Sequence, residues 1–228
     1  MKKKIVVISL GGSLIIPDKI NVKFLKKFKK VILRNTKKYK FIIVCGGGKT
    51  ARKYINALHK FTDDKKKLSF IGLSATRLNS FLVSSIFSQD PWKINYEDNL
   101  LKKELRKQDV VFDTAAEYKP NSTSDSSAAE IAKQFKGIFI NLTNVNGLFD
   151  KNPLKHKDTK FIPEISWKDF DKIAQKMKYE PGMHFVLDPT ASKIILKNKI
   201  KTYILGTNLK NLNNLLRRKK FKGTVIGK

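Results

Sequence analysis

The chain has 228 residues, of which 41% are hydrophobic. A chain of this length and composition can bury the core of one large α/β domain, so a disordered protein is excluded. Its formal net charge is +29, and its one cysteine, Cys45, excludes an internal disulfide. No segment approaches the roughly 18 apolar residues of a membrane span, and no Cys/His cluster has zinc spacing, so we expect a soluble cytoplasmic protein without a protein-built metal site.

The first sixty residues contain the same local pattern twice. The apolar run Ile5–Leu10 predicts a buried parallel strand that ends in the turn Gly11-Gly12-Ser13, and apolar residues at helical spacing predict an amphipathic helix over 22–33. The second copy comprises a strand at Phe41–Cys45, the turn Gly46–Gly48 and a helix over 49–58. Two strand–glycine–helix units are therefore predicted.

The rest of the chain continues this alternation. Further strands are predicted at 110–113, 137–142, 201–205 and 224–226, and helices at 70–87, 126–135, 167–177, 189–198 and 209–216. The alternation predicts an α/β fold: a three-layer αβα sandwich whose mainly parallel central sheet is covered on both faces. We find no internal repeat or long linker, so we expect one domain over 1–228 with two lobes that meet near residue 140.

Lysine dominates the positive charge. It occurs in short runs such as Lys65–Lys67 and Arg217–Lys220, which lack interleaved aromatic residues and are typical of solvated faces. We therefore expect the charge to steer small anionic molecules such as nucleotides, and we do not expect specific nucleic-acid binding. The alternative of a basic RNA- or nucleotide-binding protein would show steeply salt-dependent binding.

The turns after the strands are the predicted site. In an open α/β sheet, ligands bind at the carboxyl ends of the strands, where both glycine turns fall. A glycine-rich turn lets the backbone approach a phosphate, and the following helix start offers free N–H groups and partial positive charge. Neither turn has the spacing of a Walker loop or of a GxGxxG fingerprint.

Six motifs follow one another along the chain. They are Ser9–Ser13, Gly46–Arg52, Ala75–Asn79, Thr123–Asp125, Leu142–Phe149 and Leu187–Pro189. In this order, and over essentially the whole chain, they resemble the amino-acid-kinase superfamily, with its carbamate-kinase-like fold. Within it, the nearest match is the archaeal-type uridylate (UMP) kinases. The resemblance implies transfer of the ATP γ-phosphate to UMP in pyrimidine nucleotide biosynthesis, with Mg²⁺ and a homohexamer.

The resemblance also implies binding roles, with acceptor binding in the lobe of about 1–140 and ATP binding in the lobe of about 141–228. The expected ATP-binding residues are Ser9, Gly11, Gly12, Ser13, Gly48, Arg52, Thr143, Asn144, Phe149, Asn152 and Lys193. The expected UMP-binding residues are Gly47, Ser69, Thr76, Pro120, Asn121, Ser122, Thr123 and Ser124. Arg52 and Asp125 are expected to be catalytic: the first neutralises phosphate charge, and the second organises the reacting groups.

The chemistry of such a transfer agrees with this inventory. The phosphate of UMP is already an anionic nucleophile near pH 7, so no general base is needed. The site must supply in-line positioning and positive charge, which favours Lys49 as a third catalytic residue and Lys193 as a further cation. In a purely structural interpretation, Arg52 faces solvent and Asp125 only caps a helix.

The sequence departs from the motifs of these relatives at several positions. Ser69 replaces an aspartate that holds the acceptor ribose, and Asn146, Phe149 and Asn152 replace Asp, Tyr and Asp. The acceptor loop also loses a glycine at Pro120–Ser122. Each of the four substitutions removes an acidic or hydroxyl contact. A kinase for another phosphorylated acceptor, such as isopentenyl phosphate, and a non-catalytic relative therefore stay open as alternatives.

Overall fold

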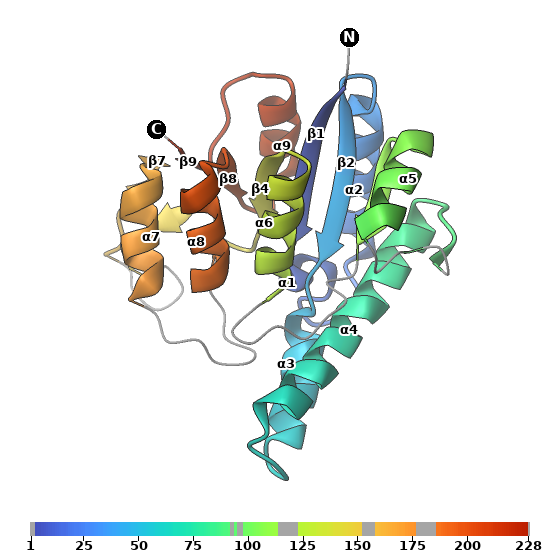
Figure 1. The fold of residues 1–228 in the computed structure, drawn as a ribbon, viewed down its shortest axis with the longest axis vertical. Helices are drawn as coiled ribbons and strands as arrows, with labels where there is room; N and C mark the ends of the chain where they lie inside the picture. Colours follow the sequence, from blue (N-terminus) through green and yellow to red (C-terminus); the bar gives the residue numbers. More distant parts are fainter. Residues whose placement is uncertain are drawn as a thin grey trace.

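Seven strands form one central sheet in the computed structural model, which describes residues 3–91, 94, 98–113, 123–151, 158–176 and 186–227 (Figure 1). Their order is β3-β2-β1-β4-β8-β9-β7, and all neighbours are parallel except β8 and β9. The strands are β1 (Lys4–Leu10), β2 (Tyr39–Cys45), β3 (Val110–Asp113), β4 (Ile138–Leu142), β7 (Glu164–Ile165), β8 (Thr202–Leu205) and β9 (Thr224–Ile226). Two further strands, β5 (Leu148–Phe149) and β6 (Phe161–Ile162), form a separate antiparallel pair.

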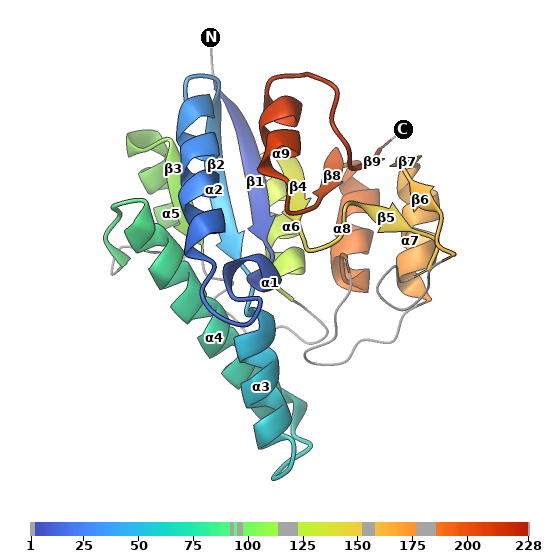
Figure 2. The same ribbon diagram turned by 180° about the vertical axis from the view of Figure 1, so that it is seen from behind.

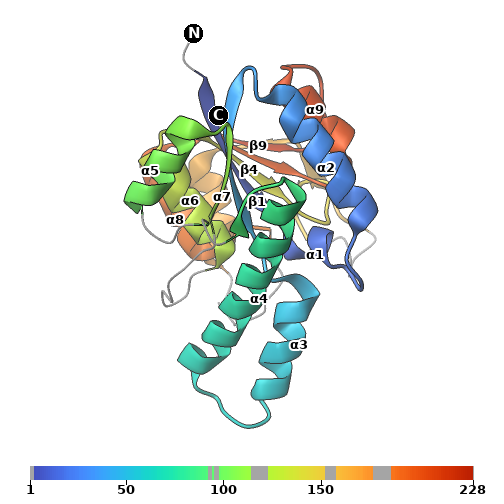
Figure 3. The same cartoon turned by 90° about the vertical axis from the view of Figure 1, so that its right-hand side faces the viewer.

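Helices cover both faces of the sheet, as the alternation of elements requires. They are α1 (Gly12–Ile15), α2 (Val22–Asn35), α3 (Gly48–Leu58), α4 (Lys65–Ile86), α5 (Asp98–Lys107), α6 (Ser124–Gln134), α7 (Trp167–Gln175), α8 (Pro189–Asn198) and α9 (Leu209–Leu216). The helices α5, α6, α7 and α8 lie on the face seen in Figure 1, and α2 and α9 lie on the opposite face seen in Figure 2. The hairpin of α3 and α4 projects beyond the carboxyl edge of the sheet (Figure 3).

The core consists of two apolar layers, one on each face of the sheet. Alternate residues of β1 divide between them: Val6, Ile8 and Leu10 contact the α2 layer, while Val7 contacts the α6 layer. All four side chains are fully buried. A strand buried on both faces reads as a nearly continuous apolar run, and Ile5–Leu10 is such a run except at Ser9.

The predicted three-layer fold is confirmed, and several elements have the predicted bounds, including β3, α8 and α9. The helix α5 was not predicted, because its sequence is dominated by charged residues. The strands β5, β6 and β7 have two residues each, too few for a periodic pattern. The expected lobe boundary near residue 140 falls within β4, in the middle of the sheet, and the division into lobes stays a prediction.

Among the residues that the structure describes, no helix combines the length and the apolar character needed to cross a bilayer.

The first two turns of the chain touch through their backbones. A Cβ atom on Gly12 would lie 2.1 Å from the backbone nitrogen of Gly48 and 2.5 Å from the carbonyl oxygen of Gly46. Gly48 itself has a φ of +65°, which side chains rarely adopt. The two turns can be this close only because glycine occupies both sides of the contact.

Gly12→Ala is therefore expected to lower the free energy of unfolding by about 3 kcal/mol, because rigid backbone atoms block the added methyl group. Denaturant unfolding measures this change. The control is Gly72→Ala in α4, where the added Cβ would meet only the flexible end of the Ile55 side chain, at 2.9 Å. We expect the control to stay within about 1 kcal/mol of the parent, because alanine also favours the helix. Equal effects of the two substitutions would contradict the backbone contact.

Candidate active site

Three strand ends and one helix meet at the carboxyl edge of the sheet. The Gly11 N–H donates to the Leu142 carbonyl at the end of β4 (2.8 Å), and the Gly46 N–H donates to the Leu10 carbonyl at the end of β1 (2.9 Å). From α4, the side-chain amide of Asn79 donates to the Gly46 carbonyl (2.7 Å). The glycine turns predicted to form the site are thus held together by hydrogen bonds.

The amino end of α3 begins at these turns. Its N-cap is Gly47, which provides no side-chain cap, and its first turn, Gly48 to Thr50, contains no acidic residue. The first N–H groups of a helix lack partners within the helix and carry partial positive charge. A helix start with these properties, beside a second glycine turn, is suited to binding phosphate.

Two cations were predicted to act at this helix start. Arg52 lies one turn into α3 and is half-buried, and desolvation lowers the pKa of its guanidinium, although arginine stays protonated at neutral pH. Lys49 instead forms an ion pair with Asp18, and both side chains are well exposed. Arg52 is therefore the more buried of the two cations, whereas Lys49 is paired with a surface carboxylate.

Asp125 reaches the end of β1 from the first turn of α6. The Ser9 hydroxyl donates to its carboxylate at 2.5 Å, which joins two predicted site residues that are 116 positions apart. Burial, together with the nearby Asp188 carboxylate, raises the pKa of Asp125 to about 7, although the Ser9 hydrogen bond lowers it. Asp125 thus lies at the turns and changes its charge near neutral pH.

Asp188 holds the start of α6 against the start of α8. It is only 5% exposed and accepts hydrogen bonds from the Thr123 hydroxyl (2.6 Å), the Ser126 hydroxyl (2.6 and 2.7 Å) and the Ala191 N–H (2.8 Å). The sequence predicted it as a helix start, which is confirmed, with Pro189 as the first helical residue. The sequence did not predict the contacts of Asp188 with α6, although Asp188 belongs to the Leu187–Pro189 motif.

The residues predicted to bind ATP are only partly brought together. Thr143 is buried at the end of β4, next to Gly11, and its N–H donates to the Leu205 carbonyl (2.9 Å). Phe149 lies in β5 and contacts Phe161 edge-on, with 5.4 Å between ring centroids. Asn144 and Lys193 are exposed, the latter on α8. The other predicted ATP-binding residues lie at the end of β1, in the first two turns and in the helices that follow them: Ser9, Gly11, Gly12, Ser13, Gly48 and Arg52.

The residues predicted to bind UMP lie at the starts of two helices and on α4. Thr76 is buried, its hydroxyl donates to the Gly72 carbonyl (3.2 Å), and the same oxygen would lie 3.1 Å from a Cβ on Gly47. Thr123 caps α6, followed by Ser124, and Ser69 is partly exposed on α4. Four predicted positions lie outside the described residues: Pro120, Asn121, Ser122 and Asn152.

The residues at the turns do not form a closed metal cage. Within the described part of the chain, no group of three or more His, Cys, Asp and Glu side chains could hold a metal ion. Magnesium usually binds through one or two carboxylates together with substrate phosphates. Asp125 can supply one such carboxylate, so the donor set fits an ion that arrives with a nucleotide.

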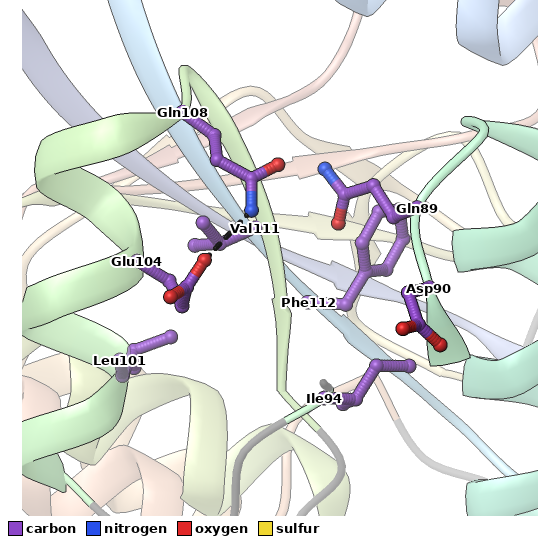
Figure 4. A pocket seen from close by; sticks show the side chains of 8 residues that line it. All are labelled: Gln89, Asp90, Ile94, Leu101, Glu104, Gln108, Val111 and Phe112. Carbon is purple, nitrogen blue, oxygen red and sulfur yellow. Dashed lines mark hydrogen bonds between the residues drawn. The ribbon is translucent and has the colours of Figure 1, made fainter. Parts of the chain in front are cut away.

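A separate pocket lies between the end of α4, the helix α5 and the edge strand β3 (Figure 4). Gln89, Glu104, Gln108 and Phe112 line it, and the Gln108 amide donates to the Glu104 carboxylate (2.9 Å). None of the residues predicted to bind a substrate lines this pocket. It is therefore not part of the candidate active site.

Comparisons with known proteins agree with this geometry. Residues 4–206 match the family model described as the amino acid kinase family. A uridylate kinase of Methanococcus aeolicus is 35% identical, covering 97% of this chain and 98% of the relative, and one of Pyrococcus abyssi is 31% identical over 88% and 89%. The crystal structure of uridylate kinase from Archaeoglobus fulgidus superposes with a TM-score of 0.81 at 29% identity, covering 97% and 99% of the two chains. The chain therefore belongs to the amino acid kinase family.

Proposed function

We propose that this protein transfers the terminal phosphate of ATP to UMP and releases UDP and ADP. The main support for phosphate transfer is the start of α3, which has no side-chain cap and lies against the Gly11–Gly12 turn. Arg52 follows one helical turn later. The relatives named above are uridylate kinases and match almost the whole chain, which supports the choice of UMP as acceptor. We found no feature that favours isopentenyl phosphate or a non-catalytic role.

The proposed reaction needs no proton transfer from the protein. An oxygen of the UMP phosphate attacks the γ-phosphorus of ATP, a new P–O bond forms, and the bond to the β–γ bridging oxygen breaks as ADP leaves. Backbone N–H groups at the start of α3 and the Arg52 guanidinium would neutralise the charge that gathers on the two phosphates. Bound Mg²⁺ would neutralise further charge on the ATP phosphates.

We assign the remaining groups by their position. Ser9 and Asp188 act on Asp125: the first holds its carboxylate by a hydrogen bond, and the second fixes the start of α6 from which it projects. Thr76, beside Gly47, and Thr123, at the start of α6, would contact the acceptor. The lobe of residues 1–140 would then bind UMP, and the lobe of residues 141–228 would bind ATP.

We also propose a cytoplasmic role in pyrimidine nucleotide synthesis, carried out by a homohexamer. Several large apolar side chains on the α3–α4 hairpin support an assembly, because association would remove them from water. Phe61 is 86% exposed, Phe70 59% and Leu78 60%.

ADP release with UMP, CMP, dTMP and isopentenyl phosphate as separate acceptors tests the proposed function. With Mg²⁺ and ATP, we expect kcat/KM for UMP to exceed that for each other acceptor by at least about tenfold, because the acceptor-side residues are proposed to fit its base and ribose. ATP alone is the control for hydrolysis. Folded protein that phosphorylated none of the four, or that preferred isopentenyl phosphate, would contradict the proposal.

Arg52→Ala should reduce kcat/KM for UMP by about 100-fold or more, because it removes a fixed cation from the transferred phosphate. Lys53→Ala is the matched control, since Lys53 is the next residue of α3, carries the same charge and is exposed. We expect the control to stay within about twofold of the parent. If the two variants lost activity equally, the effect would come from net charge and not from the position of Arg52.

Asp125 should make the folded protein less stable as the pH rises from about 4 to 7. Its pKa is about 7 when folded and 3.8 ordinarily, so over this range the folded state holds a proton that the unfolded chain has released. Relative to Asp125→Asn, the free energy of unfolding of the parent should fall by up to about 1.4 kcal/mol per pH unit. Denaturant titrations at several pH values measure the difference, and parallel pH profiles would show that the pKa is not raised.

A further inference from the structure

Two long stretches of the sequence contain no acidic residue. They are residues 19–62 and residues 189–228. The helices α2 and α9 lie in these stretches and pack against each other on one face of the sheet (Figure 2). The Asn35 amide donates to the Asn213 side chain (3.2 Å), and the Tyr39 hydroxyl donates to the Leu216 carbonyl (2.8 Å). Lysine runs that are far apart in the sequence therefore come together in the fold.

We define the basic face as the exposed Lys and Arg side chains of residues 23–38 and 210–222. The first segment contributes seven such side chains and the second contributes six. None of them forms an ion pair with an acidic residue in the described part of the chain. Asp18, which precedes α2, is already paired with Lys49.

The opposite face of the same sheet differs. There, lysines of α5, α6 and α7 pair with acidic residues three positions earlier: Lys107 with Glu104 (3.2 Å), Lys133 with Glu130 (3.0 Å) and Lys172 with Asp169 (3.4 Å). A general preference for lysine in the chain would affect both faces alike. On the opposite face three lysines thus have acidic partners, although Lys193 and Lys197 of α8 have none among the described residues, whereas no cation of the basic face has one.

The charge pattern of α2 opposes helix formation. Lys23 and Lys27, Lys26 and Lys30, and Lys30 and Arg34 are four residues apart, so like charges are neighbours on the helix surface. The first turn contains no acidic residue and places Lys23 near the positive end of the helix dipole. A bound polyanion would attract each of these cations and so offset their mutual repulsion.

The apolar side of α2 shows what kind of polyanion fits. Phe24, Leu25, Phe28 and Ile32 are buried against the sheet, so the helix cannot insert an apolar face into a bilayer. Phe221 is partly buried against Tyr203, so the described residues of the basic face offer no exposed ring on which an unpaired base could stack. What the basic face presents is positive charge along a helix of 14 residues, about 21 Å, over which a duplex displays about a dozen phosphates.

We propose that the basic face binds the phosphate backbone of double-stranded nucleic acid without reading its sequence. The segment that follows α9 lies at the end of the sheet opposite the glycine turns (Figure 2). The segment after α9 is therefore remote from the candidate active site, whereas the start of α2 lies beside α1 at the carboxyl edge of the sheet. The inference does not depend on the proposed function.

Fluorescence anisotropy with a labelled 20-base-pair duplex, measured from about 50 to 300 mM salt, tests the proposal. The variant Lys26→Gln/Lys27→Gln/Lys30→Gln removes three charges from the basic face. The matched control Lys168→Gln/Lys172→Gln/Lys176→Gln removes three exposed lysines from α7 and its C-cap on the other face. Both variants have the same net charge, so the comparison isolates position from total charge. Circular dichroism verifies that both are folded.

We expect the parent to bind at 100 mM salt with a steep salt dependence. The α2 variant should bind at least about tenfold more weakly, with a slope of log K against log salt that is smaller by about 3, whereas the α7 variant should match the parent. Equal weakening of both variants, no binding by the parent, or tighter binding to phosphatidylserine vesicles than to the duplex would each overturn the proposal. Kinase activity measured alongside should be unchanged in both variants.

Discussion

The backbone contact between the two glycine turns fixes the geometry of the candidate site. Because β1 and β2 are parallel and in register from Lys4 with Tyr39 to Leu10 with Cys45, both strands end at the same level. The chain must turn twice in nearly the same space, and the contact between Gly12 and Gly48 leaves no room for a side chain. As a result, the start of α3 lies directly against the backbone of a second glycine turn. The proposed binding of phosphate rests on this packing.

A second constraint joins the two halves of the sheet. Asp188 accepts hydrogen bonds from three donors while almost fully buried, and those from Thr123 and Ser126 connect α8 to the start of α6. Asp125, one residue before Ser126, therefore has a fixed position relative to Ser9 on β1. Its pKa is raised first by burial in this arrangement and then by the nearby Asp188 carboxylate, because both disfavour the charged form. The charge of the Asp125 carboxylate thus depends on the contact that Asp188 makes between α8 and α6.

The sequence predicted the elements that depend on local patterns. Apolar runs gave β1 and β2, helical spacing gave α2, and the Asp188–Pro189 pair gave the start of α8. It also predicted that the two glycine turns and Asp125 meet, because parallel topology brings strand ends together. Contacts between distant elements were not predictable. Three contacts depend on three-dimensional placement that no local pattern encodes. They are the ion pair of Lys49 with Asp18, the hydrogen bond from Thr123 to Asp188, and the packing of α2 beside α9.

Position also decides which of the many positive charges can act in phosphate transfer. At physiological salt, a charge is screened over about 8 Å, while β1, with seven residues, is about 23 Å long. The cations that follow α9 lie at the far end of the strands from the glycine turns, so they contribute little beyond a general attraction for anions. Arg52 lies at the start of α3 and is partly removed from water, so its charge acts at close range. A strongly basic chain can therefore still depend on one arginine at its candidate site.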